Sequence, residues 1–167
     1  MRKIITTLVM GILLFTVAAC GGPHEERVLE EDLETLLEDI HNYEELDEET
    51  QSFLEGLSVE EVSDDRTAFH LGTEAYDYDR AIANVPELSM TPFELTLVRV
   101  SAGENIDVMV NGIKENIDPM KWGSIGVDPE SIMVDNIGDV IVIIMSDEHM
   151  DALHEAFLAL EDMYVEE

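Results

Sequence analysis

Hydrophobic residues in the first half of the chain recur at helical spacing. In residues 27–43, five of them fall on one face of a helix: Leu29, Leu33, Leu36, Leu37 and Ile40. Acidic residues fill the opposite face, so this segment is predicted to be a strongly amphipathic helix that docks on a hydrophobic core. A shorter helix is predicted near residues 48–55, and residues 58–62 are interpreted as another helical turn or a loop.

Later segments alternate between strand and helix patterns. Residues 93–100 are rich in strand-forming residues, and residues 104–117 carry apolar residues at helical spacing. Two apolar runs within residues 131–146 flank the sequence Asn-Ile-Gly-Asp, which predicts a β-hairpin. Ser146 and Asp147 are candidate N-caps for a last amphipathic helix.

The middle of the chain fits more than one structure. One strand of the predicted sheet is either missing or lies within residues 67–80, and residues 79–85 fit either a strand or a helix that Pro86 ends. The later order of strand, helix, hairpin and helix packs naturally as a sheet with helices on one face. The predicted fold class is therefore α+β: a small antiparallel sheet with helices packed on one face, ferredoxin-like in part and preceded by the amphipathic N-terminal helix.

The first residues have the organisation of a secretory signal. Arg2 and Lys3 precede an apolar run that ends in small residues and is shorter than a secure membrane span. The sequence Val-Ala-Ala-Cys at residues 17–20 resembles the bacterial lipobox, which implies lipid attachment to the Cys20 sulfur and cleavage before this residue. The alternatives are an ordinary secretory signal with a chance cysteine, or an uncleaved anchor.

The lipobox interpretation divides the chain into three parts. These are a lipoprotein signal peptide (1–19), a flexible tether (20–27) and a single acidic α+β domain (28–167). Acyl chains on Cys20 would anchor the domain, since each buried methylene contributes roughly 0.8 kcal/mol. The predicted location is the cell membrane, on its extracytoplasmic face.

The charge of the chain is strongly negative. It has 39 acidic and 8 basic residues, for a net charge of −31. No basic patch is available to neutralise phosphates, which argues against nucleic acid as a partner. Three explanations of the acidity stay open: a solvated surface suited to a salty or alkaline habitat, a cationic partner, or loosely bound divalent cations.

Motifs for catalysis or for a tightly bound cofactor are not found. The chain has one cysteine, no Gly-x-Ser-x-Gly elbow and no His-Glu-x-x-His zinc motif. His149 and His154 are five residues apart and fall on different faces of a helix, which makes a poor chelate. The prediction is that the protein is not an enzyme and carries no cofactor.

Four residues are singled out as candidate partner contacts. Lys121 and Trp122 stand together in a chain with few basic residues and a single tryptophan, and an exposed pair of this kind suits a protein partner. The alternative is a tryptophan that closes the core under a loop. Asp77 and Asp79 alternate with two tyrosines, and their alternative is an acidic strand edge.

Four stretches are together similar to small lipid-anchored proteins of anaerobic Gram-positive bacteria, a family of unknown function: FHLGTEAYDYDRAIANVPEL, ELTLVRV, IKENIDPMKWGSIGV and VDNIGDVIVIIM. The resemblance covers residues 28–162 and implies an α+β envelope lipoprotein without a defined activity. The hypothesis is a lipid-anchored, non-enzymatic binding or interaction module of the cell envelope. A solute- or cation-binding accessory lipoprotein is the alternative, and an envelope hydrolase is a third.

Overall fold

A five-stranded antiparallel sheet forms the centre of the protein. A computed structural model describes residues 28–87 and 91–164 of the 167-residue chain. The strands follow one another across the sheet in the order β1-β2-β3-β5-β4, which leaves β1 and β4 at its two edges. Their bounds are β1 Leu57–Glu61, β2 Tyr78–Pro86, β3 Glu94–Val100, β4 Ile132–Ile137 and β5 Val140–Met145.

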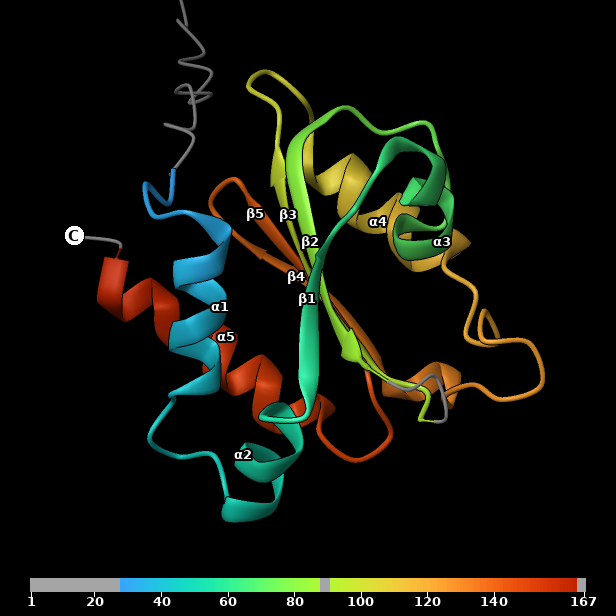
Figure 1. Ribbon diagram of the computed structural model, residues 1–167. Helices are drawn as coiled ribbons and strands as arrows, with labels where there is room; N and C mark the ends of the chain where they lie inside the picture. Colours follow the sequence, from blue (N-terminus) through green and yellow to red (C-terminus); the bar gives the residue numbers. More distant parts are fainter. Residues whose placement is uncertain (1–27, 88–90, 165–167) are drawn as a thin grey trace, which may run out of the picture.

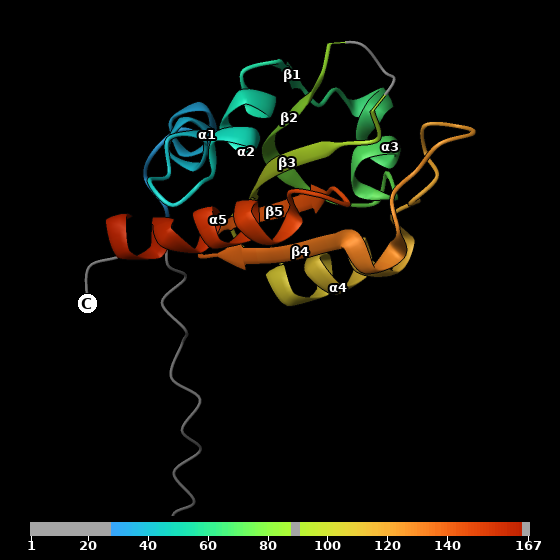
Figure 2. The same ribbon diagram turned by 90° about the horizontal axis from the view of Figure 1, so that it is seen from below.

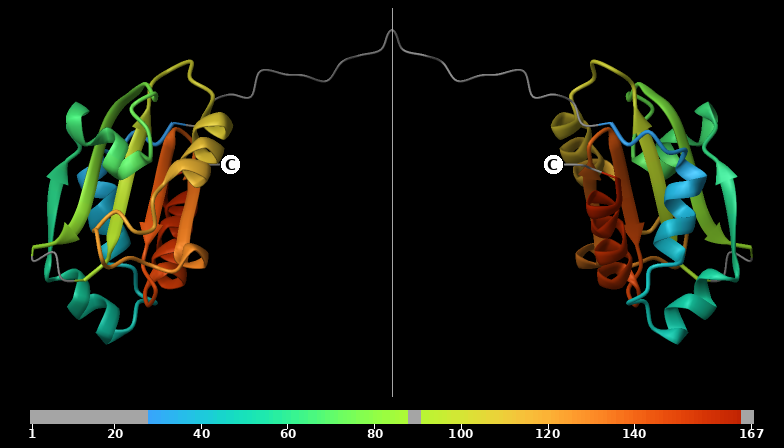
Figure 3. Two further views of the ribbon diagram at one scale, coloured as in Figure 1. Left: turned by 90° about the vertical axis from the view of Figure 1, so that its right-hand side faces the viewer. Right: turned by 90° about the vertical axis from the view of Figure 1, so that its left-hand side faces the viewer.

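Helices cover both faces of this sheet (Figure 1). On one face α1 and α5 lie side by side, and on the other face lie α3 and α4; the side views in Figure 3 look onto these two faces. The helix α2 connects α1 to β1 at one end of the sheet. The α-helices are α1 Leu33–His41, α2 Glu48–Leu54, α3 Thr67–Leu71, α4 Ile106–Asn116 and α5 Met150–Tyr164.

The α+β class and the antiparallel sheet agree with the sequence-based prediction, but the placement of all helices on one face is wrong. Every residue of β5 is buried, and its side chains alternate between two separate hydrophobic cores: Val142 and Ile144 face α1 and α5, whereas Ile141 and Ile143 face α4. A strand that is apolar on both sides needs cover on both sides. Figure 2 shows α4 and α5 on opposite sides of β4 and β5.

The ferredoxin-like resemblance is partial. Strands β3 and β4 each pair antiparallel with β5, so they run parallel to each other, with α4 as their connection and β5 inserted between them. This is a split βαβ unit. The helix that follows the hairpin, α5, lies on the face opposite α4, which departs from a sandwich with all helices on one side.

Two strands occupy the region that was ambiguous in the sequence. Residues 58–62, interpreted as a turn or loop, mostly belong to the strand β1. Residues 79–85 are strand rather than helix, and β2 ends at Pro86. The strand expected within residues 67–80 begins only at Tyr78, because α3 occupies the earlier part of this range.

The predicted hairpin forms as the sequence indicates, and the last helix begins at Met150, slightly later than the predicted caps Ser146 and Asp147 suggest. The β4–β5 turn consists of Gly138 and Asp139, and Gly138 has a positive φ of 55°. Asn136 Nδ2 donates a hydrogen bond across the turn to the Gly138 carbonyl at 3.1 Å. Before α5, the Ser146 hydroxyl accepts a hydrogen bond from the His149 backbone N–H at 2.9 Å, as an N-cap does.

The amphipathic helix α1 is fixed to the sheet through its preceding segment. Arg99 of β3 donates to the backbone carbonyls of Leu29 and Glu31, at 2.6 and 2.5 Å, and forms an ion pair with Asp139. Leu29 also donates its N–H to Asp139 at 2.9 Å. In residues 28–87 and 91–164, no helix has the length and apolarity to cross a membrane.

Candidate functional site

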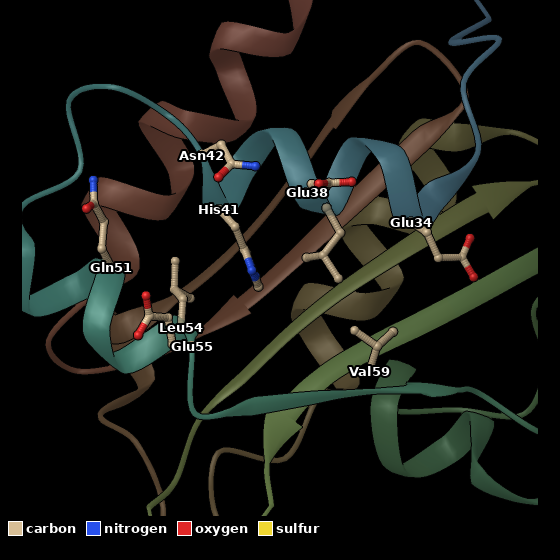
Figure 4. A pocket seen from close by; sticks show the side chains of 9 residues that line it. Glu34, Glu38, His41, Asn42, Gln51, Leu54, Glu55 and Val59 are labelled. Atoms are coloured by element: carbon tan, nitrogen blue, oxygen red, sulfur yellow. The ribbon is translucent and has the colours of Figure 1, made fainter.

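A groove of about 490 Å³ lies between α1, α2 and β1 (Figure 4). The groove lies at the edge of the sheet, where α1 does not extend over the edge strand β1. Leu37 of α1 and Leu54 of α2 are buried at its base. His41 of α1 points from above into the space between α1 and β1, and Val59 of β1 points into it from below. The groove therefore combines an apolar floor with polar groups.

Both helices that form the walls are held in place by local caps. Asp32 accepts a hydrogen bond from the Thr35 N–H at 2.8 Å before α1, and Asp47 accepts one from the Thr50 N–H at 2.7 Å before α2. Such a cap supplies one of the acceptors that the first turn of a helix lacks. The cap matters most for α2, which has only seven residues.

Glu34, one of the acidic residues that line the groove, is paired with an arginine. Arg80 of β2 donates two hydrogen bonds to Glu34 of α1, at 2.6 and 2.5 Å, and lies 3.8 Å from Glu61 of β1. These hydrogen bonds hold the pKa of Glu34 below its ordinary range. Between described residues, no ion pair engages the other two glutamates on the rim, Glu38 and Glu55, so the rim carries negative charge.

His41 supplies a hydrogen-bonding group inside the groove. Its Nε2 atom lies 3.2 Å from Oδ1 of Asn84 on β2. Burial lowers the pKa of His41, because the protein interior disfavours the charged imidazolium. The lowered pKa favours the neutral imidazole, which does not compensate the negative charge of the rim.

Lys121, a predicted partner contact, lies in the interior. Its side chain is 3 % exposed, and its Nζ atom lies 2.7 Å from Oε2 of the fully buried Glu94. Lys121 also donates to the Phe69 carbonyl at 3.2 Å. A side chain this deeply buried does not fit the interpretation as a contact for an external partner.

Glu94 is the centre of this buried ionic cluster, which consists of Glu94, Lys121 and His70. His70 Nδ1 lies 3.1 Å from Glu94 Oε2, and the Thr96 hydroxyl donates to Glu94 Oε1 at 2.8 Å. Burial raises the pKa of Glu94, but Lys121 and His70 outweigh this effect and hold the pKa below its ordinary value. The cluster joins α3, β3 and the segment after α4, and its burial denies access to a substrate.

The other predicted contacts fall at separate places. Trp122 is partly buried and packs against the core shared by α3 and α4, as in the alternative of a core-closing tryptophan. Asp77 and Asp79 are exposed at the start of β2, where the Ser101 hydroxyl donates to both, at 3.3 and 2.9 Å. The four residues therefore do not form one surface. Cys20 lies outside the described residues.

Sequence reasoning missed both the groove and the buried cluster. The groove depends on β1, which was interpreted as a turn or loop, and on its position beside two helices. For the cluster one signal existed: Glu94 is an acidic residue at the start of a mainly apolar strand, and buried carboxylates require partners. Its partners are distant in sequence, so the pattern did not identify them.

No group of three or more His, Cys, Asp or Glu residues among the described ones is arranged to hold a metal ion. No family model, no curated protein and no solved structure compared with the chain matches it. The similarity to small lipid-anchored proteins therefore stays a prediction from the sequence.

Proposed function

We propose that the protein is a lipid-anchored, non-enzymatic binding module of the cell envelope, and that the groove between α1, α2 and β1 is its binding site. The groove itself carries this proposal. Hollows of several hundred cubic ångströms with an apolar floor and a few polar groups are typical of ligand sites. Here the buried Leu37 and Leu54 form the floor, and Glu38 and Glu55 stand at the rim.

The chemistry of the groove favours recognition over catalysis. Its histidine, His41, is held by the amide of Asn84 rather than by a carboxylate that would make it a stronger base. Its carboxylates are exposed at the rim instead of facing each other across a desolvated cleft, as acid–base catalysis of glycoside cleavage needs. A cationic or polar ligand with an apolar part suits these groups.

Anchorage through Cys20 places this module at the membrane surface, on the extracytoplasmic side. The test is Cys20→Ala in the full chain, followed by fractionation of cells and mass analysis of the lipid. We expect the substituted protein to fold normally and to move from the membrane to the medium. A protein that stays in the membrane without lipid would overturn the anchorage.

Binding in the groove is tested by photo-crosslinking in intact cells. A benzophenone amino acid replaces Val59 in the groove or, as the matched control, Val108, which is exposed on α4 on the other face of the sheet. We expect a discrete adduct from position 59 that Glu38→Lys suppresses, and none from position 108. Equal labelling at both positions, or no adduct at position 59, would contradict the proposed binding site.

A further inference from the structure

The open edge of the sheet runs along the groove. β1 is the last strand on its side, and within the described residues no strand lies beyond it. Just after β1, the Val62 N–H donates to the Ala81 carbonyl of β2 at 2.9 Å. In an antiparallel ladder the residues that bond to the neighbour alternate with residues that do not. Ser58 and Glu60 therefore bond toward β2, whereas Val59 and Glu61 direct their N–H and carbonyl groups away from it.

The side chains of these outward-bonding residues lie on the groove side of the sheet. Residues directly opposite each other in a ladder share a face. Val59 is opposite Asn84, which contacts His41 of α1, and Glu61 is opposite Ile82, which belongs to the core under α1. At Val59, a chain that pairs with the free edge of β1 can therefore bond to the backbone N–H and carbonyl and also contact the half-exposed side chain.

Charge determines which chain fits this edge. On β1, Glu60 and Glu61 lie 3.4 and 3.8 Å from Arg66 and Arg80, whereas Glu38 and Glu55 on the groove rim have no ion pair among the described residues. Acidic residues on an edge strand oppose its pairing with an identical edge, and a net charge of −31 on each copy adds to this repulsion. The carboxylates of Glu38 and Glu55 attract a segment that carries lysine or arginine.

We propose that β1 receives an extended, basic peptide segment of a partner protein as a sixth strand of the sheet. In such strand addition the backbone hydrogen bonds supply affinity and alternate side chains supply specificity. An apolar side chain of the incoming segment packs on Val59, and basic side chains two residues to either side reach Glu38 and Glu55. The inference rests on the groove being the binding site and names the class of partner.

The probe is the fluorescent peptide Ser-Lys-Thr-Val-Thr-Lys-Ser, blocked at both ends, and the protein is the full chain in a non-ionic detergent. The matched control for this probe is the same peptide with both lysines replaced by glutamate. We expect saturable binding of the basic peptide by fluorescence anisotropy. The acidic peptide, or the basic peptide with its valine nitrogen methylated, is expected to bind at least about tenfold more weakly, since one lost charged or backbone contact has this magnitude.

Protein variants locate the site. Val59→Pro removes an N–H that points away from β2, so it blocks strand addition while it keeps the ladder to β2. Glu38→Gln combined with Glu55→Gln is expected to lower affinity, and Glu115→Gln, an exposed acid on α4, is the control that leaves it unchanged. Circular dichroism verifies that each variant is folded. Equal affinity of Val59→Pro and the unmodified chain would overturn the proposal.

Hydrogen exchange of single amides separates strand addition from other binding in the groove. We expect the Val59 and Glu61 amides to exchange quickly in the free protein and slowly with the bound peptide, whereas the Ser58 and Glu60 amides are protected in both. Binding without slower exchange at Val59 and Glu61 would overturn strand addition and leave the groove as a binding site. If the chain forms a dimer and Val59→Pro converts it to monomers, the partner at β1 is a second copy of the chain, and the proposal of a basic partner is overturned.

Discussion

The ammonium group of Lys121 lies 2.7 Å from the carboxylate of Glu94, in a place where both side chains are almost completely removed from solvent. β3 brings Glu94 to the face of the sheet that α3 and α4 cover, and α3 adds His70 at 3.1 Å. Each charge alone would be very unfavourable in this environment, and together they compensate each other. The pair therefore makes the packing of α3, β3 and the segment after α4 interdependent.

Removal of one partner of the buried pair should be strongly destabilising. We expect Glu94→Gln to lower the free energy of unfolding by about 3–5 kcal/mol, because Lys121 is left with an uncompensated buried charge. The double variant Glu94→Gln/Lys121→Met should recover part of this loss. Urea unfolding measures both, with Glu104→Gln, an exposed acid, as the control. A loss under about 1 kcal/mol for Glu94→Gln would contradict the compensation of charges.

The pH dependence of stability should carry the signature of Glu94. Its pKa in the folded protein is lower than the ordinary value of 4.5, so its ionised form stabilises the fold. This contribution is complete above the ordinary pKa and is lost as the pH falls through the lowered pKa of the folded state. The difference in unfolding free energy between the natural chain and Glu94→Gln should therefore be constant near neutral pH and shrink in acid. A stability difference that grows in acid would contradict a lowered pKa of Glu94 in the folded protein.

The cap of α2 should support both stability and the groove. We expect Asp47→Ala to cost about 1 kcal/mol, because the Thr50 N–H loses its acceptor, whereas Asp47→Asn keeps an acceptor and costs less. Since α2 ends with Leu54 and is capped by Glu55, fraying of this short helix should also weaken binding of the basic peptide. Thermal unfolding and anisotropy measure the two effects. Equal behaviour of the alanine and asparagine variants would exclude a role of the cap.

Two glycines with similar backbone angles should respond differently to alanine. Gly72 and Gly103 have φ values of 81° and 92°, which disfavour any side chain. A Cβ atom at Gly72 would lie 2.6 Å from the backbone carbon of Asn116, whereas nothing lies within 4 Å of one at Gly103. We expect Gly103→Ala to cost about 1–2 kcal/mol for the backbone angle alone. Gly72→Ala should cost clearly more, measured by urea unfolding; equal losses would contradict the close contact with α4.

Local patterns predicted most of the elements because each was decided by its own residues. The leucine stripe, the hairpin turn at Gly138 and the hydrogen bond of Ser146 lie within short segments whose spacing or turn chemistry is distinctive. The helix predicted over residues 27–43 is shorter in the structure, since α1 begins only at Leu33 and Leu29 precedes it. β1 was not predicted because three of its five residues are polar and its only β-branched residue, Val59, is exposed. An edge strand needs little apolar surface, so its sequence resembles a loop.

The layer arrangement was predictable in principle from β5. An unbroken run of six apolar residues at Val140–Met145 indicates a strand buried on both faces, and this excludes a sheet with helices on one side only. The candidate site was not predictable in the same way. Its floor and rim come from α1, α2 and β1, and their proximity depends on tertiary packing, such as the contact between His41 and Asn84.

Under the proposed anchorage through Cys20, the contacts of Arg99 would have a mechanical consequence. Any pull on the body enters through Leu29 and Glu31, whose carbonyls both accept hydrogen bonds from this one side chain of β3. Asp139, at the turn between β4 and β5, binds both Arg99 and the Leu29 N–H. Under that proposed anchorage, tension from the N-terminal side would act on β3 and on the β4–β5 turn as well as on α1.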